Sequence, residues 1–211
     1  MTAKELFCFL DSVLSKVGEH SPVSICYLHK PCKTGRKCST GSSWPVIDFD
    51  KIKDVYCKCK KKGSLSSVDG YTHNNNIFCF VEIKGWNEFL QHNILKLNQA
   101  KITKQANRYD FKKKLLESAE ICRQSVHDEN LFKEQSLAAI ILTDIDTTLF
   151  SNFEPGLLSF NTNLQLLSQK EVKIEDICNT SIHKRMDTIP SEFNKYYISC
   201  WDFDRLMRKI R

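Results

Sequence analysis

The run from Ile77 to Lys84 constrains the fold more than any other segment of this chain. Alternate residues of a β-strand share a face. One face of this run is apolar throughout and holds Ile77, Cys79, Val81 and Ile83. The other face begins with two aromatic residues and ends in charge, with Phe78, Phe80, Glu82 and Lys84. An acid and a base at the end of an otherwise buried strand predict that this end opens onto a cleft.

A second β-compatible run, Leu65 to Tyr71, precedes this strand, and the polar stretch His73 to Asn76 separates the two runs. Asparagine tolerates turn conformations, so we expect a hairpin. An even number of residues in the connecting loop places Asp69 on the same face as Glu82, directly across from it or one diagonal step away. An odd number without a bulge separates the two carboxylates.

Helical patterns occur before and after the hairpin. Thr2 and Glu5 form an S/T-x-x-E capping box ahead of apolar residues at helical spacing, which predicts an amphipathic first helix and accounts for the glutamate. From Glu88 to Val126 there is neither proline nor glycine, and apolar residues recur at near-helical intervals. This region is predicted to form one long helix or two in succession. Short helices are expected around Leu164 to Gln169 and Ile174 to Cys178.

Two further runs complete the predicted sheet. Leu137 to Leu142 is continuously apolar and bounded by polar residues, which is typical of a strand covered on both faces. Tyr196 to Trp201 indicates another strand near the end of the sequence. Together with the hairpin and the helices, this order predicts an α/β fold with a mixed central β-sheet flanked by helices.

The composition is that of a globular protein, with 41% hydrophobic and 27% charged residues in a chain of 211. This length suits one compact domain, so residues 1–211 are predicted to form a single domain. No apolar run approaches the length of a membrane span, and we expect no membrane partner. The formal net charge of +6 favours a polyanionic partner without requiring one. Charged residues interrupt the segment from Thr2 to Val17, so it lacks the apolar stretch of a secretory signal, which predicts a cytoplasmic protein.

Residues 22–62 are predicted to form a cysteine-rich, loop-rich segment with a short extended piece near Asp54 to Cys59. Six candidate ligands of a structural Zn²⁺ lie in it: Cys26, His29, Cys32, Cys38, Cys57 and Cys59. Their spacings differ from the usual C-x2-C knuckles. The favoured interpretation is therefore reduced thiols, with zinc as the alternative.

Two carboxylates and an ammonium group converge if the hairpin has the favourable register. Asp69 and Glu82 could then bind one hard cation through oxygen, with the Ile83 carbonyl as a third ligand, as Mg²⁺ prefers. Such a site is suited to metal-assisted hydrolysis of a phosphodiester, in which Lys84 orients the attacking water or stabilises the transition state. The alternative is an exposed strand end whose acid and base have no catalytic role.

Val68-Asp69, twelve intervening residues and Glu82-Ile83-Lys84 resemble the PD-(D/E)xK nuclease superfamily, with Val68 in place of the proline of the family name. The resemblance covers the chain from about Leu65 to Leu142. It implies a restriction-endonuclease-like core, Mg²⁺ or Mn²⁺ as cofactor, and a metal-dependent endonuclease. In that family Asp69 and Glu82 would be metal ligands and Lys84 the catalytic lysine.

The resemblance also favours DNA over RNA as the substrate and restriction, antiphage defence, recombination or mobile-element processing as the setting. Phosphate contacts alone do not distinguish the two nucleic acids. The competing interpretation is a non-catalytic nucleic-acid-binding or protein-interaction module on a nuclease-like fold. A homodimer or a protein partner is compatible with either.

Polar residues of the predicted long helix supply a candidate surface for nucleic acid. Lys101, Gln105, Arg108 and Lys112 recur at intervals of four, three and four, so on one helix they share a narrow stripe. A helix after the E-x-K strand often supplies a Gln or Lys in the resembled family, which makes Lys101 and Gln105 the matching candidates. The alternative is a solvated polar face. Asp144 and Asp146 could reach a second metal, although aspartates after strands are usually turn or cap residues.

Overall fold

The computed structural model describes residues 1–29, 41–61, 63–93, 98–147 and 163–210. Its centre is a six-stranded sheet in which the strands lie in sequence order. They are β1 (Val23–Ser24), β2 (Pro45–Asp48), β3 (Gly70–Asn74), β4 (Ile77–Lys84), β5 (Ser136–Thr143) and β6 (Phe193–Ser199). The first four strands pair antiparallel, and β5 and β6 extend the sheet parallel to β4. The predicted α/β class with a mixed sheet is confirmed.

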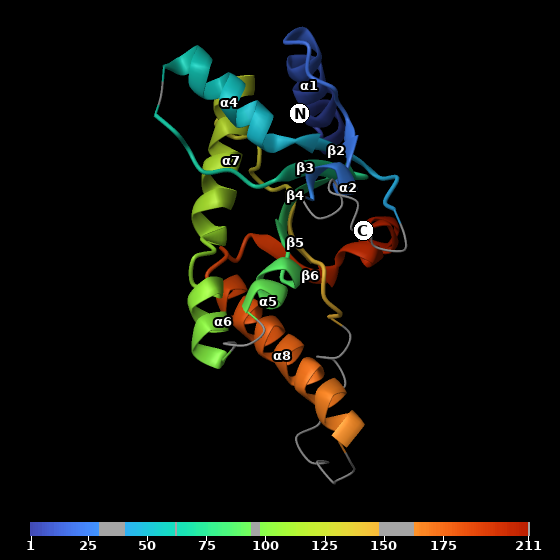
Figure 1. Ribbon diagram of the computed structural model, residues 1–211. Helices are drawn as coiled ribbons and strands as arrows, with labels where there is room; N and C mark the ends of the chain where they lie inside the picture. Colours follow the sequence, from blue (N-terminus) through green and yellow to red (C-terminus); the bar gives the residue numbers. More distant parts are fainter. Residues whose placement is uncertain (30–40, 62, 94–97, 148–162, 211) are drawn as a thin grey trace.

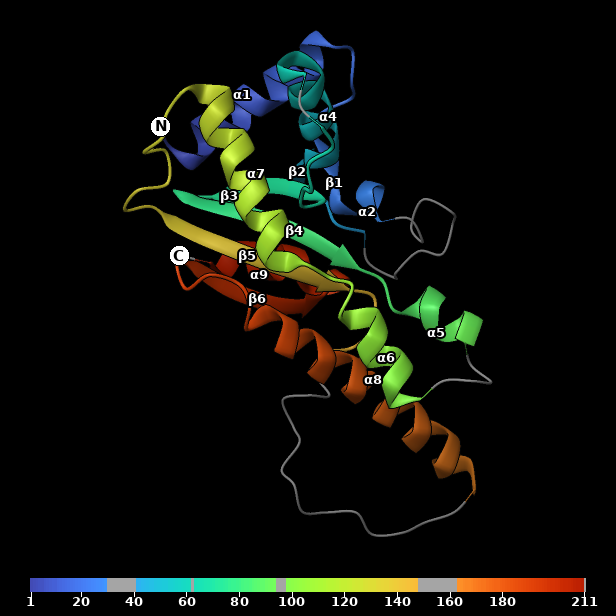
Figure 2. The ribbon, with the colours of Figure 1, turned by 90° about the vertical axis from the view of Figure 1, so that its left-hand side faces the viewer.

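Helices cover both faces of this sheet. Figure 1 shows α7 (Phe111–Val126) and α9 (Phe203–Lys209) on opposite sides of the central strands. The face on the α7 side also packs against α1 (Ala3–Lys16), α4 (Phe49–Lys60) and α8 (Asn163–Met186). Within the described ranges, the other helices are α2 (Ile25–Leu28), α5 (Asn87–Asn93), α6 (Gln99–Ala106) and the 3-10 turn η3 (Cys200–Asp202). Figure 2 shows α6 beside α8, beyond one end of the strands.

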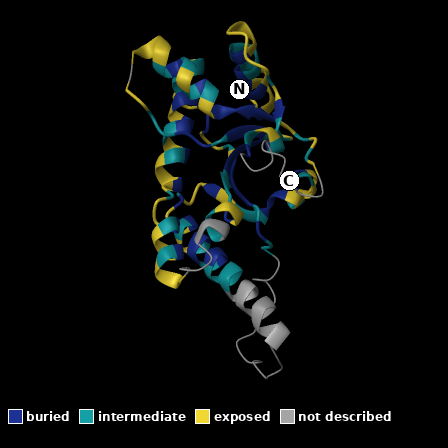
Figure 3. Ribbon diagram, in the orientation of Figure 1, coloured by how far each residue is buried: buried dark blue, intermediate teal, exposed yellow. Residues whose placement is uncertain are grey.

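The alternation predicted for β4 is confirmed. Phe78 and Phe80 belong to the large core between the sheet and helices α1, α4 and α7. The alternate residues Ile77, Cys79 and Val81 belong to a second core that includes residues of α9. Burial on both faces explains why the central strands are dark in Figure 3, while the outer surfaces of α4 and α7 are exposed.

The register of the β3–β4 hairpin decides where the two predicted carboxylates lie. Asn74 pairs with Ile77, so the turn holds two residues, Asn75 and Asn76. Asn75 has a φ of 49°, in the left-handed region that asparagine tolerates better than most residues. The loop is therefore even, as the favourable register requires.

The strand β3 begins at Gly70, later than predicted. The residues before it have backbone N–H groups that donate to helix side chains rather than to a neighbouring strand. Ser66 donates to a carboxylate oxygen of Glu117 at 2.5 Å, and Val68 donates to the hydroxyl of Ser118 at 3.0 Å. The early start was wrong because side chains of α7 satisfy this segment in place of a strand ladder.

The extended piece predicted near Asp54 to Cys59 is also wrong, because these residues lie in helix α4. The Asp48 side chain accepts a hydrogen bond from the backbone N–H of Lys51 and so caps the helix. Its buried residues are spaced by three and four positions: Phe49, Ile52 and Tyr56. The basic residues that follow Cys57 made this amphipathic pattern hard to see in the sequence.

In the described part of the region from Glu88 to Val126, which leaves out residues 94–97, the chain forms three helices rather than one or two. New caps interrupt it twice. The Asn98 side chain accepts from Lys101 N at the start of α6, and the Asp110 side chain accepts from Lys113 N at the start of α7, each at 3.0 Å. Asn and Asp compete with the helical backbone through such local hydrogen bonds, which explains the breaks.

The helices α1 and α8 differ in how well the sequence predicted them. The capping box of α1 is present, with Thr2 N donating to Glu5 at 2.7 Å and Glu5 N donating to Thr2 Oγ1 at 3.2 Å. The two short helices expected between Leu164 and Cys178 are instead parts of the single helix α8. Its C-terminal half buries Cys178, Ile182 and Met186 in the large core.

Candidate functional site

Glu82 lies near the end of β4, on the face that carries Phe78 and Phe80, and it is only 1% exposed. Its oxygen Oε1 forms ion pairs with the ammonium groups of Lys84 and Lys114, the second at 2.7 Å. Its oxygen Oε2 is buried and has no hydrogen-bond partner among the described residues. A buried carboxylate is costly unless it is paired. Here the two lysines balance its charge through one oxygen and leave the other unsatisfied.

Asp69 lies immediately before β3 and next to Glu82 in the hairpin register. Gly70 pairs with Val81, so continuation of the register sets Asp69 opposite Glu82. The Asp69 oxygen Oδ2 accepts a hydrogen bond from the backbone N–H of Ile83 at 2.6 Å, and its backbone carbonyl accepts from Phe49 N. The two carboxylates are therefore neighbours, as expected for an even loop, and a strand neighbour fixes the orientation of Asp69.

Two helices hold the segment that leads into Asp69. Ser67 Oγ donates to the Asp50 carboxylate of α4 at 2.5 Å, and the fully buried Ser118 of α7 accepts from Val68 N. Because both α4 and α7 form hydrogen bonds with this segment, the position of Asp69 depends on the packing of these helices against the sheet.

Lys84 is largely enclosed, with a side chain that is 15% exposed. Its ammonium lies 5.0 Å from the centre of the Tyr109 ring, a cation–π contact. The Tyr109 hydroxyl in turn accepts a hydrogen bond from Gln105 Nε2 at 3.3 Å. Gln105, predicted as a site residue, is thus connected to Lys84 through Tyr109.

The charges of the site shift its titration in defined directions. Burial raises the pKa of Glu82 and the charge of Asp69 raises it further, against the opposing charges of Lys84 and Lys114. Burial lowers the pKa of Lys84, but the charges of Glu82 and Asp69 outweigh it, and the net shift is upward. Lys84 therefore stays protonated at neutral pH, and Glu82 takes up a proton more readily than an ordinary glutamate.

Lys114 is a site residue that sequence reasoning missed. It follows the start of α7 and lies one residue before the buried Leu115, at the edge of the buried face of the helix. It also precedes the buried Ser118 by four positions, the spacing of neighbours on one helix face. That spacing identifies Lys114 as inward-facing only once the start of α7 is known.

Gly85 follows the E-x-K sequence at a crowded point. A Cβ atom there would lie 3.2 Å from Asp144 Oδ2 and 3.2 Å from His29 Nε2. The Asp144 carboxylate accepts from the backbone N–H groups of Trp86, at 2.6 Å, and Asn87 at the beginning of α5. In the structure Asp144 therefore caps the beginning of α5, which agrees with the turn or cap alternative of the sequence.

His29 lies beside Asp144, with 3.9 Å between His29 Nε2 and Asp144 Oδ2. Burial lowers the pKa of His29, against the charges of Asp144 and Asp69. His29 is one of the zinc candidates of the sequence, and its charged neighbours in the structure are Asp144 and Asp69. Two of the other zinc candidates, Cys32 and Cys38, lie outside the described residues. Cys26, Cys57 and Cys59 are described and form no disulfide.

The predicted basic stripe does not exist as one helix face. Lys101 and Gln105 lie on α6, Arg108 follows it, and Lys112 begins α7, because the caps described above divide the helix. Arg108 donates to the Gln105 side chain at 3.3 Å, so two of the four residues are in contact. Arg108 and Lys112 are exposed, and Lys101 and Gln105 are half-buried.

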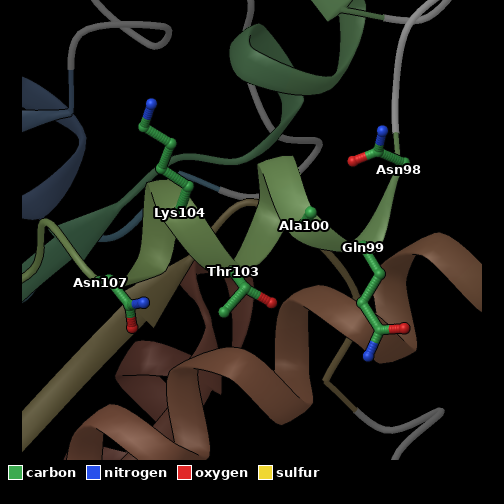
Figure 4. Close-up of a pocket in the computed structure, with 6 residues that line it drawn as sticks. All are labelled: Asn98, Gln99, Ala100, Thr103, Lys104 and Asn107. Atoms are coloured by element: carbon green, nitrogen blue, oxygen red, sulfur yellow. The ribbon is translucent and has the colours of Figure 1, made fainter.

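A hollow of about 720 Å³ lies along α6 and does not include the carboxylate cluster. Figure 4 shows that its lining comes from one helical segment, with Lys104 as the charged member. The lining residues are Asn98, Gln99, Ala100, Thr103, Lys104 and Asn107. A wall from a single helix offers few convergent groups, so the cluster around Glu82 is the stronger candidate site.

Comparison with protein-family models, with curated proteins and with solved structures gives no match to this chain. Within the described ranges, no helix is both long and apolar enough to cross a membrane. In the same part of the chain, no three His, Cys, Asp or Glu side chains are grouped so that they could hold a metal ion. A cation at the candidate site would therefore depend on two carboxylates and a backbone carbonyl.

Proposed function

We propose that this protein is a metal-dependent nuclease that hydrolyses phosphodiester bonds at the site formed by Asp69, Glu82 and Lys84. The observation that carries the proposal is the buried Glu82 carboxylate. Two lysines pair with one of its oxygens, the other has no hydrogen-bond partner among the residues that the structure describes, and Asp69 lies beside it. A purely structural ion pair would favour an arrangement in which both oxygens are satisfied.

The residues present fit a hard divalent cation, Mg²⁺ or Mn²⁺. Asp69, Glu82 and the carbonyl of Ile83 would hold it, because such ions take oxygen ligands and usually retain several waters. The unsatisfied Glu82 Oε2 is the acceptor that the fold leaves available. When bound, the ion would lower the pKa of a water and neutralise charge on the phosphate.

The protein's own groups would orient the reaction. Ile83 N–H fixes one oxygen of Asp69, and Lys84 fixes one oxygen of Glu82. Since Lys84 stays protonated, it would act as a fixed positive charge for the transition state rather than as a base. Tyr109 covers its ammonium and keeps it from bulk water, which strengthens its electrostatic effect.

Several finer features belong to the proposal. The restriction-endonuclease-like core, DNA as the substrate, and a role in restriction or antiphage defence follow from the sequence resemblance. A cytoplasmic location, a single domain and a homodimer stay predictions of the sequence, as does the zinc alternative. Lys101, Gln105, Arg108 and Lys112 stay candidates for contact with nucleic acid, now as members of separate elements.

Substitution of the two charged residues tests the proposal. Glu82→Ala and Lys84→Ala should each reduce Mg²⁺- or Mn²⁺-dependent plasmid cleavage at least about hundredfold. Glu82→Ala removes a proposed ligand of the cation, and Lys84→Ala removes the positive charge proposed to stabilise the transition state. Agarose gels measure cleavage, and circular dichroism checks folding. Glu120→Ala is the matched control, since Glu120 is an exposed glutamate of α7 that pairs with Arg123 on the surface.

Two results would contradict the nuclease. One is cleavage by the wild type that survives both substitutions while the control behaves normally. The other is nucleic-acid binding by the wild type without any metal-dependent cleavage, which would favour the non-catalytic module.

A further inference from the structure

Lys114 is the more accessible of the two ammonium groups on Glu82. Its side chain is 28% exposed, whereas that of Lys84 is 15% exposed and lies against Tyr109. Lys114 also extends from a surface helix, and Lys84 extends from a strand inside the sheet. A ligand that arrives from solvent can therefore reach Lys114 first.

The beginning of α7 is basic around Lys114. Lys112 and Lys113 precede it directly and are exposed. The ammonium of Lys113 lies 3.9 Å from Glu117, so that pair is loose. Neighbouring ammonium groups on one surface attract polyanions such as a nucleic-acid backbone.

The charges of the site balance as they stand. Counted as formal charges, Asp69 and Glu82 are two negative groups, and the lysines paired with Glu82, Lys84 and Lys114, are two positive groups. Asp50, whose charge also acts on both lysines, is paired with Lys53. With a divalent cation at the carboxylates the sum becomes positive. A bound phosphate and outward movement of one ammonium would relieve the repulsion, and Lys114 is the more exposed of the two lysines.

We propose that Lys114 is a phosphate-binding residue of this site. In the free protein it pairs with Glu82, and when a cation neutralises the Glu82 carboxylate, Lys114 turns toward a phosphate of the nucleic-acid backbone. This inference rests on the proposed nucleic-acid substrate. It assigns Lys114 a role in holding the substrate, in addition to its contact with Glu82.

The test removes the charge of Glu82 without supplying a metal. Glu82→Gln keeps the size of the side chain and deprives both lysines of their anionic partner. Affinity for a fluorescein-labelled DNA duplex is measured by fluorescence anisotropy in EDTA for the wild type, Glu82→Gln, Lys114→Met and the double variant. Glu82→Gln should bind the duplex about two- to fivefold more tightly than the wild type. This factor corresponds to the free energy of one exposed ion pair, here between Lys114 and a DNA phosphate. The gain should disappear in the double variant.

Lys113→Met is the matched control, because Lys113 does not contact Glu82. It should weaken binding by the same factor whether residue 82 is Glu or Gln. Lys114→Met should weaken binding more when residue 82 is Gln. Salt dependence gives a second readout, since one added phosphate contact steepens the slope of log K against log salt by about 0.9.

The outcomes separate the two proposals. Tighter binding by Glu82→Gln that persists in the double variant, or equal effects of Lys114→Met in both backgrounds, would overturn the role of Lys114 alone. Absence of binding to DNA by every variant at low salt would overturn the proposed substrate and this inference with it.

A second comparison avoids dependence on the folding of Glu82→Gln. Lys114→Met and Lys113→Met are compared in the otherwise natural protein with and without Ca²⁺, a hard cation that takes oxygen ligands. Lys114→Met should lose more affinity for the duplex when Ca²⁺ is present, and Lys113→Met should lose the same in both conditions. Equal losses for Lys114→Met with and without Ca²⁺ would contradict the inference.

Discussion

Two neighbouring positions on one face of β4, one in its aromatic part and one in its charged part, are buried to the same degree and differ in what they bury. Phe80 is 0% exposed and Glu82 is 1% exposed, although only one residue separates them. Phe80 packs edge-on against four aromatic rings, whose centroids lie between 5.6 and 6.4 Å away, those of Phe49, Tyr71, Phe132 and Phe193. Glu82 is held by two lysines and keeps an unsatisfied oxygen.

This contrast shows where the fold is stabilised and where it is not. Burial of an aromatic ring removes a large apolar area from water and favours folding. Burial of a carboxylate costs desolvation that even well-placed ammonium groups only partly offset. Proteins retain residues that lower stability in this way mainly at functional sites. The position of Glu82, near the end of an otherwise apolar strand, fits such a site.

The largest expected effect lies at the aromatic end. Phe80→Ala should destabilise the protein by about 3–5 kcal/mol, because it leaves a cavity between the sheet and its helices. Urea unfolding followed by circular dichroism measures the change. Leu116→Ala is the control, since Leu116 is an exposed residue of α7 and should change stability by no more than about 0.5 kcal/mol. Equal changes in the free energy of unfolding for the two substitutions would show that packing around Phe80 does not stabilise the fold as expected.

An intermediate effect is expected beside the charged end. Gly85→Ala should cost about 1–3 kcal/mol, because the added methyl group would press on both His29 and Asp144. Gly63→Ala is a matched control, since a Cβ at Gly63 would meet nothing within 4 Å. Thermal unfolding of the two variants makes the comparison. If Gly85→Ala were as stable as Gly63→Ala, the close packing after Lys84 would be refuted.

The smallest expected effect is a pH dependence of stability at Glu82. Burial and Asp69 raise the pKa of Glu82, so the folded protein binds this proton more tightly than the unfolded chain does. Stability from this group is therefore complete below the ordinary value of 4.5 and is lost as the pH rises through the folded-state pKa.

Thermal unfolding as a function of pH measures this dependence. The wild type should lose stability relative to Glu82→Gln as the pH increases above that ordinary value, while Glu120→Gln should follow the wild type. A wild type that instead gains stability relative to Glu82→Gln over this range would mean that the lysine pairs outweigh burial.

Local features of the sequence predicted a substantial part of the fold. The capping box predicted α1, the alternation from Ile77 to Lys84 predicted the two faces of β4, and the continuous apolar run predicted the buried β5. The sequence left both registers of the hairpin open, and the two-residue turn of the structure selects the one that sets Asp69 opposite Glu82. Each of these depends on neighbours along the chain or across one turn, where spacing alone fixes direction.

Errors arose where partners distant in the sequence decide the structure. The helix α4 depends on burial of Phe49, Ile52 and Tyr56 against other elements, and the late start of β3 depends on side chains of α7. The helical periodicity of α4 was too weak to recognise in a basic, cysteine-rich stretch of sequence. Nothing near Ser66 in the sequence signals the second.

The sequence by itself determined a hairpin, the two faces of β4, an apolar strand beside it and helices around them, because alternation and capping are local. Whether the two acids lie together depended on the turn, which the structure sets at two residues. Only the tertiary structure decided that Lys114 meets Glu82, that His29 lies beside Asp144, and that Gln105 reaches Lys84 through Tyr109. These contacts join residues from separate helices and strands. Their geometry depends on how α6 and α7 pack against the sheet, and residue spacing does not encode that packing.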